Sequence, residues 1–214
     1  MILLATDRQT VRGLSVSCFL PAGIFSYHCP LETARFFCEK KEISGAILDA
    51  VPDLPAAEAL ARDLRERYPD LPMALILPPH VRPNAPVDLL VPDQPSESLA
   101  ADLLRFLRDQ VGWRSDFSTY ALSIPLDGTE ARLLGYPFPL APREAAILRC
   151  LFVFAPRVVS GDDLLLLCFP EGTQRVANLS VQISRINRRA AEIGLPDLIV
   201  SEYGRGYRLN RAII

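Results

Sequence analysis

Short apolar runs alternate with amphipathic segments through the first half of the chain. Five short, mainly apolar runs, at residues 2–6, 24–29, 45–50, 73–77 and 87–91, are bounded by Pro, Gly or charged residues, as buried strands are. Between them, apolar residues recur at helical spacing near residues 9–20, 31–41, 56–68 and 97–110. Strands that alternate with helices predict a doubly wound, five-stranded parallel sheet.

One connection in this half departs from the alternation. Residues 78–86, PPHVRPNAP, contain four prolines between the fourth and fifth predicted strands. Proline lacks the backbone N–H that a helix interior needs. We therefore expect the helix at this place to be lost or reduced to a turn.

The second half has a different pattern. Residues 111–118 lack clear periodicity and are expected to link a domain at 1–110 to a domain at 119–214. Short strands are predicted near 120–124 and 130–136, and helices are predicted from about Pro142 and from Ser160. A third helix follows at 174–194, in which apolar residues separated by 3, 4, 3 and 4 form one buried stripe. These residues are Val176, Leu179, Ile183, Ile186 and Ala190.

The polar side of that third helix is unusual in its chemistry. It displays Asn178, Gln182, Arg185 and Arg189, next to Arg188, and no acidic residue occurs between Glu171 and Glu192. Solvated helix faces normally mix charges of both signs. Carboxamides can pair with adenine, and arginines with guanine or phosphate, so the pattern predicts a DNA-binding face. A plain solvated face is the open alternative.

The stretch SEYGRGYRL, near the end of the chain, predicts a hairpin. Gly204 and Gly206 flank Arg205 and permit a tight reversal between two strands. Such a hairpin beside a recognition helix is typical of a winged helix, and Arg205 would meet the negative potential of a narrow minor groove. A turn that only happens to hold an arginine is the alternative.

Composition and charge restrict the class of protein. Half of the residues are hydrophobic and the net charge is −2, which excludes a disordered chain. The apolar runs are shorter than the roughly 20 residues of a membrane span, and no signal peptide is evident, so a cytoplasmic protein is expected. Residues 1–110 carry 11 Lys and Arg against 15 Asp and Glu, whereas residues 119–214 carry 11 against 9. The five cysteines form no CxxC pair and are interpreted as buried apolar residues.

Several motifs carry a resemblance to a known family. The run AILDA, and then LAPREAAIL, VVSGDDLL, VQISRINRR and YGRGYRL in that order, resemble the OmpR/PhoB class of response regulators over nearly the whole chain. The resemblance implies a receiver domain followed by a winged-helix DNA-binding domain. It also implies base contacts by Asn178, Gln182 and Arg185. Phosphate contacts would come from Arg188 and Arg189, and the predicted DNA-binding set further includes Arg175 and Arg205.

The receiver-like half departs from the family's phosphorylation site. Asp49 falls on the phosphoacceptor position and Asp7 on one position of the acidic pair, but Thr6 stands at the other. Leu77 replaces the hydroxyl residue and Val91 the lysine. A site without these groups would neutralise a phosphoryl group poorly, so we expect a degenerate receiver that does not use aspartyl phosphorylation. Residual phosphorylation of Asp49, with bound Mg²⁺, is the alternative; otherwise no cofactor or metal is expected.

These patterns predict a transcription regulator that binds double-stranded promoter DNA as a homodimer, independently of a sensor kinase and of membranes. In the alternative function, both domains dock protein partners such as RNA polymerase or a signalling protein. An enzyme is not expected, because His28 and His80 have no evident Ser, Cys or metal-ligand partner at useful spacing.

Overall fold

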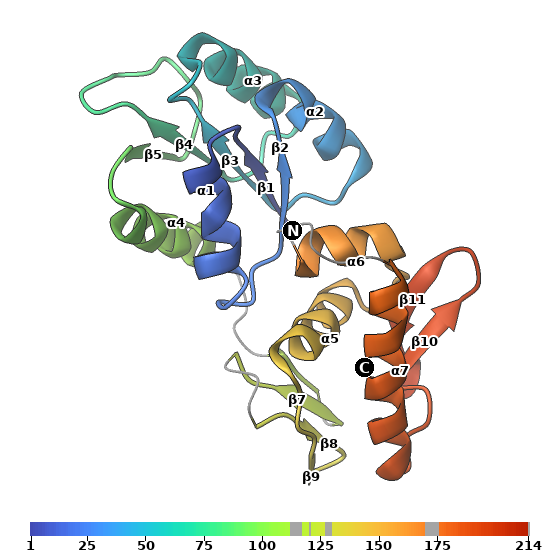
Figure 1. Ribbon diagram of the computed structural model, residues 1–214. Helices are drawn as coiled ribbons and strands as arrows, with labels where there is room; N and C mark the ends of the chain where they lie inside the picture. The colour runs from blue at the N-terminus through green and yellow to red at the C-terminus, as the bar shows by residue number, and fades with distance from the viewer. Residues whose placement is uncertain (112–116, 120, 127–129, 170–175, 214) are drawn as a thin grey trace. The chain divides into compact units, whose positions relative to one another are not determined.

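The computed structural model of the chain describes residues 1–111, 117–119, 121–126, 130–169 and 176–213 (Figure 1). It divides into two compact units, Met1–Phe19 with Ile24–Trp113 and Leu20–Gly23 with Arg114–Ile214. Most of the predicted linker lies outside the described residues. Its last two residues, Phe117 and Ser118, pair with a strand of the second unit, which therefore begins earlier than residue 119.

The first unit is built on the predicted five-stranded parallel sheet. Its strands are β1 (Ile2–Ala5), β2 (Ser26–Cys29), β3 (Gly45–Asp49), β4 (Met73–Leu77) and β5 (Leu89–Pro92). They lie in the order β2-β1-β3-β4-β5, and every pairing is parallel. All residues of β1, β3 and β4 are buried, which explains why these strands read as continuous apolar runs.

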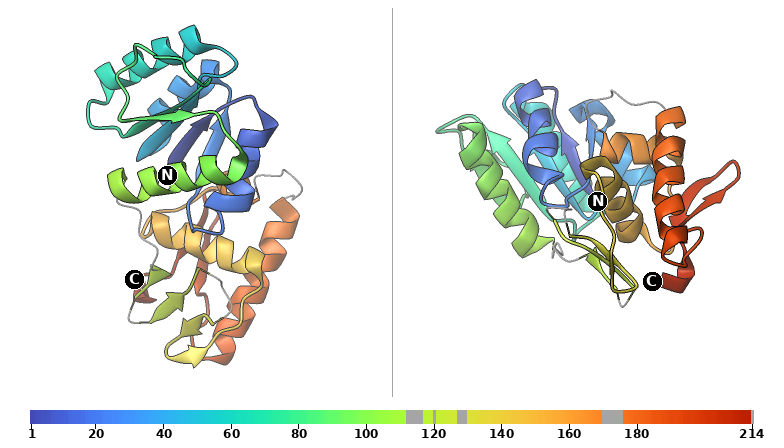
Figure 2. Two further views of the ribbon diagram at one scale, coloured as in Figure 1. Left: turned by 90° about the vertical axis from the view of Figure 1, so that its left-hand side faces the viewer. Right: turned by 60° about the horizontal axis from the view of Figure 1, so that its bottom comes forward.

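Helices cover both faces of this sheet. They are α1 (Gln9–Leu14), which continues as a π-helical turn at Ser15–Phe19, α2 (Leu31–Lys40), α3 (Leu54–Arg67) and α4 (Ser96–Gln110). Figures 1 and 2 show α2 and α3 on one face and α1 and α4 on the other. This arrangement confirms the predicted doubly wound fold and brings the carboxyl ends of β1, β3 and β5 to one edge.

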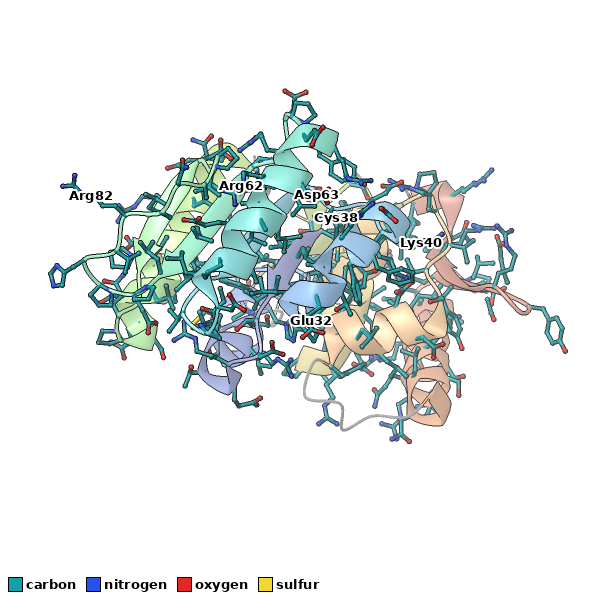
Figure 3. All side chains as sticks on the ribbon, turned by 90° about the horizontal axis from the view of Figure 1, so that it is seen from above. Glu32, Cys38, Lys40, Arg62, Asp63 and Arg82 are labelled. Carbon is teal, nitrogen blue, oxygen red and sulfur yellow. The ribbon has the colours of Figure 1, made fainter. Side chains whose placement is uncertain are left out.

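The connection from β4 to β5 contains no helix anywhere along residues 78–88, all of which are described, as its prolines predict. Side chains of α3 hold this loop instead. Arg62 donates to the Asn84 carbonyl at 2.9 Å and Arg65 to the Pro86 carbonyl at 3.1 Å. The backbone N–H of Asn84 donates to Glu58 at 2.7 Å. Figure 3 shows Arg62 on α3 and Arg82 projecting away from the loop.

The second unit combines a small antiparallel sheet with three helices and a hairpin. The sheet contains β6 (Phe117–Ser118), β7 (Leu122–Ile124), β8 (Arg132–Leu133) and β9 (Tyr136–Pro137), in that order. The helices are α5 (Pro142–Phe154), α6 (Gly161–Cys168) and α7 (Val176–Glu192), and the hairpin is β10 (Ile199–Glu202) with β11 (Gly206–Leu209). A short 3-10 helix, Arg211–Ile213, follows the hairpin. This is the architecture of the predicted winged helix.

Two local details of this unit bear on the sequence predictions. The single strand expected at 130–136 is wrong, because Leu134 and Gly135 have φ of 53° and 82° and form a turn between β8 and β9. The predicted start of a helix at Ser160 is confirmed, and Ser160 is the N-cap of α6: its hydroxyl accepts from the backbone N–H of Asp163 at 3.1 Å.

Candidate nucleic-acid interface

The orientation of α7 follows from its buried stripe. Leu179, Ile183, Ile186 and Ala190 are buried, as the sequence predicts, whereas Val176 lies outside the described side chains. Each residue turns by about 100° around the axis of an α-helix. Val181 and Arg188 therefore lie opposite the buried stripe, and both are exposed.

The exposed side of α7 forms one continuous surface, which we call the α7 face. It consists of Asn178, Ser180, Val181, Ser184, Arg185 and Arg188, and it is followed at the end of the helix by the exposed Ala191 and Glu192. Five residues of the face, all except Asn178, line a shallow hollow. Among the described residues, neither Arg185 nor Arg188 forms an ion pair, and the first acidic residue of α7 is Glu192 at its end. The face thus offers two guanidinium groups, a carboxamide, two hydroxyls and one apolar side chain.

The predicted α7 residues do not all reach this face. Asn178, Arg185 and Arg188 are exposed, and Gln182 is half-buried at the margin. Arg175 lies outside the described residues. Val181, which is 47% exposed, was not predicted as a member of this face, because the prediction considered only polar residues. Its place opposite the buried stripe was the signal that could have identified it.

The prediction for Arg189 needs correction. Its Nη2 lies 2.5 Å from Oε2 of Glu144, a residue at the start of α5 that is only 3% exposed. The guanidinium also lies over the Phe138 ring, 5.8 Å from the ring centroid. The same Glu144 oxygen accepts from the backbone N–H of Ala141 at 2.8 Å. Arg189 is therefore used within the unit to hold α7 against α5 and does not belong to the α7 face.

Asn187 fixes α7 to the hairpin. Its Nδ2 donates to the Ile199 carbonyl at 2.8 Å, and its Oδ1 accepts from the Ile199 N–H at 2.8 Å. Ile199 pairs with Leu209 of β11, and the two bonds from Asn187 satisfy the backbone N–H and carbonyl of Ile199. Two hydrogen bonds therefore join the helix to the hairpin, and Figure 1 shows them side by side.

The hairpin is also fixed to the segment before α6. Backbone N–H groups and carbonyls of Val159 and Tyr207 bond in both directions, each at 2.8 Å. Gly206 has a φ of 134°, and a Cβ at this position would lie 2.0 Å from the Val159 carbonyl oxygen. Only glycine, which lacks a Cβ, fits such a close approach. Gly206 is therefore required for the packing of the hairpin against Val159. The other glycine of the hairpin, Gly204, has a φ of 69° and forms the turn.

Both arginines at the hairpin share one carboxylate, which leaves this group of three side chains with a net positive charge. Glu202 accepts from Arg205 at 2.8 Å and from Arg208 at 2.7 Å. The hydrogen bond from Arg208 is the main cause that lowers the pKa of Glu202, so the carboxylate stays ionised. Arg205 is exposed, as predicted, but its guanidinium is paired.

The edge of the first unit around Asp49 is closed by a cation from the loop after β1. Asp49 is fully buried. Arg8 Nε donates to its Oδ2 at 2.7 Å and Arg8 Nη2 to its Oδ1 at 2.9 Å, while Nη1 reaches Asp93 at 2.9 Å. The Thr6 hydroxyl donates at 2.6 Å and the Val51 N–H at 3.2 Å. Partial burial opposes ionisation of Arg8, but its bonds to Asp49 and Asp93 raise the pKa of the guanidinium.

This arrangement does not fit a Mg²⁺ site. A guanidinium covers both carboxylate oxygens of Asp49, and Asp7 lies toward Arg12, 3.4 Å away. In the described part of the chain no group of three or more His, Cys, Asp or Glu residues is placed to hold a metal ion. Sequence reasoning looked for a lysine after β5 and missed Arg8 and Asp93. Arg8 directly after the first strand, at the same edge as Asp49, was the available signal.

The expectation that His28 has no serine partner is wrong. Its Nε2 lies 2.5 Å from the Ser15 hydroxyl and 3.3 Å from that of Ser26. Burial lowers the pKa of His28 to about 4, with the charge of Arg12 as a second cause. Ser15 is itself only 2% exposed, so this group packs the sheet edge and offers no accessible nucleophile.

The cysteines are free and mostly buried, as interpreted from sequence. Burial raises the pKa of Cys29 to about 12 and that of Cys38 to about 11. The thiolate is the reactive form, so these groups are inert at neutral pH. As for membranes, none of the helices within the described ranges has the length and apolar character that a span requires.

No family model and no curated protein matches the chain. Solved structures with similar folds include the response regulator DrrB of Thermotoga maritima, described as an OmpR/PhoB homolog. It is 21% identical with a TM-score of 0.42, and the match covers 98% of this chain and 97% of that one.

Another belongs to a family of redox sensors in the streptococci that evolved from two-component response regulators. It is 15% identical with a TM-score of 0.42, over 98% of both chains. The DNA-binding domain of the response regulator AdeR, solved in complex with an intercistronic region, is 17% identical with a TM-score of 0.39; the match covers 44% of this chain and 96% of that one. Because these sequence identities are low, the function of this chain has to be inferred from its own residues.

Proposed function

We propose that this protein is a transcription regulator that binds promoter DNA through the α7 face and the β10–β11 hairpin, without aspartyl phosphorylation. The observation that carries the proposal is the α7 face, on which Arg185 and Arg188 are exposed and unpaired within the described structure while the neighbouring Arg189 is neutralised by Glu144. A DNA backbone carries one negative charge per roughly 1.7 Å of helix axis, and such a face is complementary to it.

The individual groups of the α7 face suit the major groove. An α-helix fits into this groove, where arginine can bond to guanine or to a phosphate and a carboxamide to adenine. The Asn178 and Arg185 side chains are exposed for such contacts. Val181, between them, presents methyl groups that can pack against the methyl group of thymine. Arg188 lies further along the helix, where a phosphate contact is expected.

The proposal extends to a homodimer. One recognition helix reads only a few base pairs, and regulators of this architecture gain specificity by placing two helices on repeated half-sites. The proposal requires no sensor kinase, because both carboxylate oxygens of Asp49, which would accept a phosphoryl group, are bonded to Arg8.

Recovery of genomic DNA fragments by the purified protein tests the function. The affinity for a recovered fragment is expected to fall steeply with added salt. Arg185→Ala should weaken binding by about 10-fold or more, equivalent to about 1.4 kcal/mol. Arg132→Ala, an exposed arginine of β8, is the matched control and should leave affinity almost unchanged.

The opposite results would favour protein docking. If no fragment is retained at low ionic strength, and RNA polymerase or another protein is captured with little dependence on salt, the DNA-binding proposal is wrong. Equal losses for Arg185→Ala and Arg132→Ala would show that binding follows total charge and that the α7 face has no special role.

A further inference from the structure

The tip of the β10–β11 hairpin presents an aromatic side chain to solvent. Tyr203 is the most exposed large hydrophobic residue in the described chain, with its side chain in full contact with solvent. It directly follows β10 and precedes Gly204, whose positive φ makes the turn. Aromatic side chains are ordinarily stabilised by burial within a domain. Tyr203 is not buried, so packing within the unit does not explain an aromatic ring at this position.

Arg205, the other candidate at the tip, is restrained by its charge partner. Its guanidinium bonds to Glu202, which also accepts from Arg208. To enter a narrow groove, Arg205 would have to leave Glu202 or carry this ionised carboxylate toward the phosphates. Both routes cost electrostatic energy, because the carboxylate would lose a partner or approach like charge. Tyr203 forms no ion pair that entry into a groove would have to break, and Glu202 stays paired with both arginines when the ring enters.

The hairpin is stiff enough to position its tip. Paired backbone bonds between Val159 and Tyr207 fix one strand, and the Asn187 side chain fixes the start of the other. Gly206 allows the closest of these contacts. With both strands held, the backbone position of Tyr203 is set by the same framework that orients α7.

We propose that Tyr203 is the residue by which the hairpin contacts DNA, with its ring packed along the sugar walls of the minor groove and its hydroxyl donating to base acceptors. Arg205 remains with Glu202 and lies at the edge of the groove. This inference rests on the proposed function. The minor groove of A·T pairs exposes only the N3 and O2 acceptors, whereas G·C pairs add an amino group that obstructs a ring. Tyr203 therefore selects A·T pairs beside the sequence that α7 reads.

The test compares four proteins on one recovered DNA fragment by fluorescence anisotropy. Tyr203→Ala is expected to weaken binding by about 10-fold, and Tyr203→Phe by less, since the ring remains. Arg205→Ala should weaken binding by no more than about 3-fold, as for an exposed charge that is already paired. Changing A·T to G·C pairs at the position under the hairpin should weaken the wild type but leave Tyr203→Ala unaffected.

A minor-groove drug gives an independent readout. Netropsin should compete with the wild type and compete much less with Tyr203→Ala. All variants should keep the wild-type Tm, because the substituted side chains are exposed.

The inference is overturned if Tyr203→Ala binds as the wild type does, or if Arg205→Ala loses more affinity than Tyr203→Ala. In either case the loss caused by Arg185→Ala would still support the proposed function. Failure of the wild type to bind any fragment at low salt overturns both the proposed function and this inference.

Discussion

Arg8 illustrates how one side chain changes the chemistry of an edge of a sheet. Its guanidinium bonds to both oxygens of Asp49 and also reaches Asp93. A buried carboxylate that lost this partner would be left with an uncompensated charge, which typically costs about 3–5 kcal/mol. The ion pair is therefore difficult to open, and a phosphoryl donor would have to open it to reach Asp49.

We expect acetyl phosphate to leave the protein unmodified. The reason is that the oxygens of Asp49 are covered by Arg8 and Thr6 and that no Mg²⁺ ligand set is assembled beside them. Intact mass spectrometry, together with DNA affinity before and after treatment, checks the expectation. A gain of one phosphoryl group that disappears in Asp49→Ala would contradict it.

His28 supplies a pH dependence at the same scale. Its pKa of about 4 in the folded chain lies below the usual value of 6.5, so the unfolded chain binds a proton more readily between these values. Stability from the neutral imidazole is present above pH 6.5 and is lost as the pH falls toward 4. The loss at pH 4 is at most about 3 kcal/mol.

Urea unfolding at pH 7 and pH 5 measures this effect. His28→Gln keeps a group that can bond to the serine hydroxyls but does not titrate, and should show a smaller loss of stability at pH 5. An equal loss in the wild type and in His28→Gln would assign the pH dependence to other groups.

Residues such as Arg8 and His28 show where sequence reasoning ends. The partners of Arg8 are 41 and 85 positions away, and one partner of His28 is 13 positions away. Periodicity places Arg8 after a strand and His28 within one. It carries no information about which side chains from different elements come into contact. The positions were predictable, and the pairings were not.

At the scale of elements, α7 shows what periodicity does provide. The buried stripe was predictable because apolar residues must face the rest of the unit. The line Asn178, Gln182, Arg185 and Arg189 has helical spacing too, but it lies about 100° from the centre of the buried stripe and not opposite to it. Asn178 and Arg185 are thus exposed, whereas Gln182 and Arg189 are half-buried. The partner of Arg189, Glu144, comes from a different helix and could not be read from the period.

Arg189→Ala tests this structural role. Removing the guanidinium leaves Glu144 buried with only the Ala141 N–H as partner, so the second unit should lose about 3 kcal/mol of stability. Chemical denaturation measures the loss, and Arg188→Ala, on the exposed side, is the matched control with little expected effect. If the two variants unfold alike while Arg189→Ala alone weakens DNA binding, the original assignment of Arg189 to phosphate contact is restored.

At the scale of the whole molecule, the alternation of strands and helices was sufficient to predict the fold of the first unit. Continuous apolar runs identified β1, β3 and β4, and the prolines between β4 and β5 identified the missing helix. The start of the second unit was placed too late, because a two-residue strand such as β6 has too little length for any period to appear.

Thiol accessibility tests the packing of both units together. Four of the five cysteines are buried, and only Cys18 is partly accessible. In the native protein we therefore expect a chromogenic disulfide reagent to modify no more than one thiol quickly at neutral pH, and all five after unfolding in guanidinium chloride. Cys18→Ser should abolish the fast phase. Rapid reaction of several thiols without denaturant would contradict the packing described here.

The pairing of Arg8 with Asp49 has a consequence for control. In a phosphorylated switch, the group that changes the state is added by one enzyme and removed by another. Here the carboxylate at the corresponding position is neutralised by a guanidinium of the same chain, and this pairing is in place once the chain folds. If acetyl phosphate leaves the protein unmodified, as we expect, such an edge keeps no record of a transient stimulus, and control would fall to the amount of the protein or to a ligand bound elsewhere.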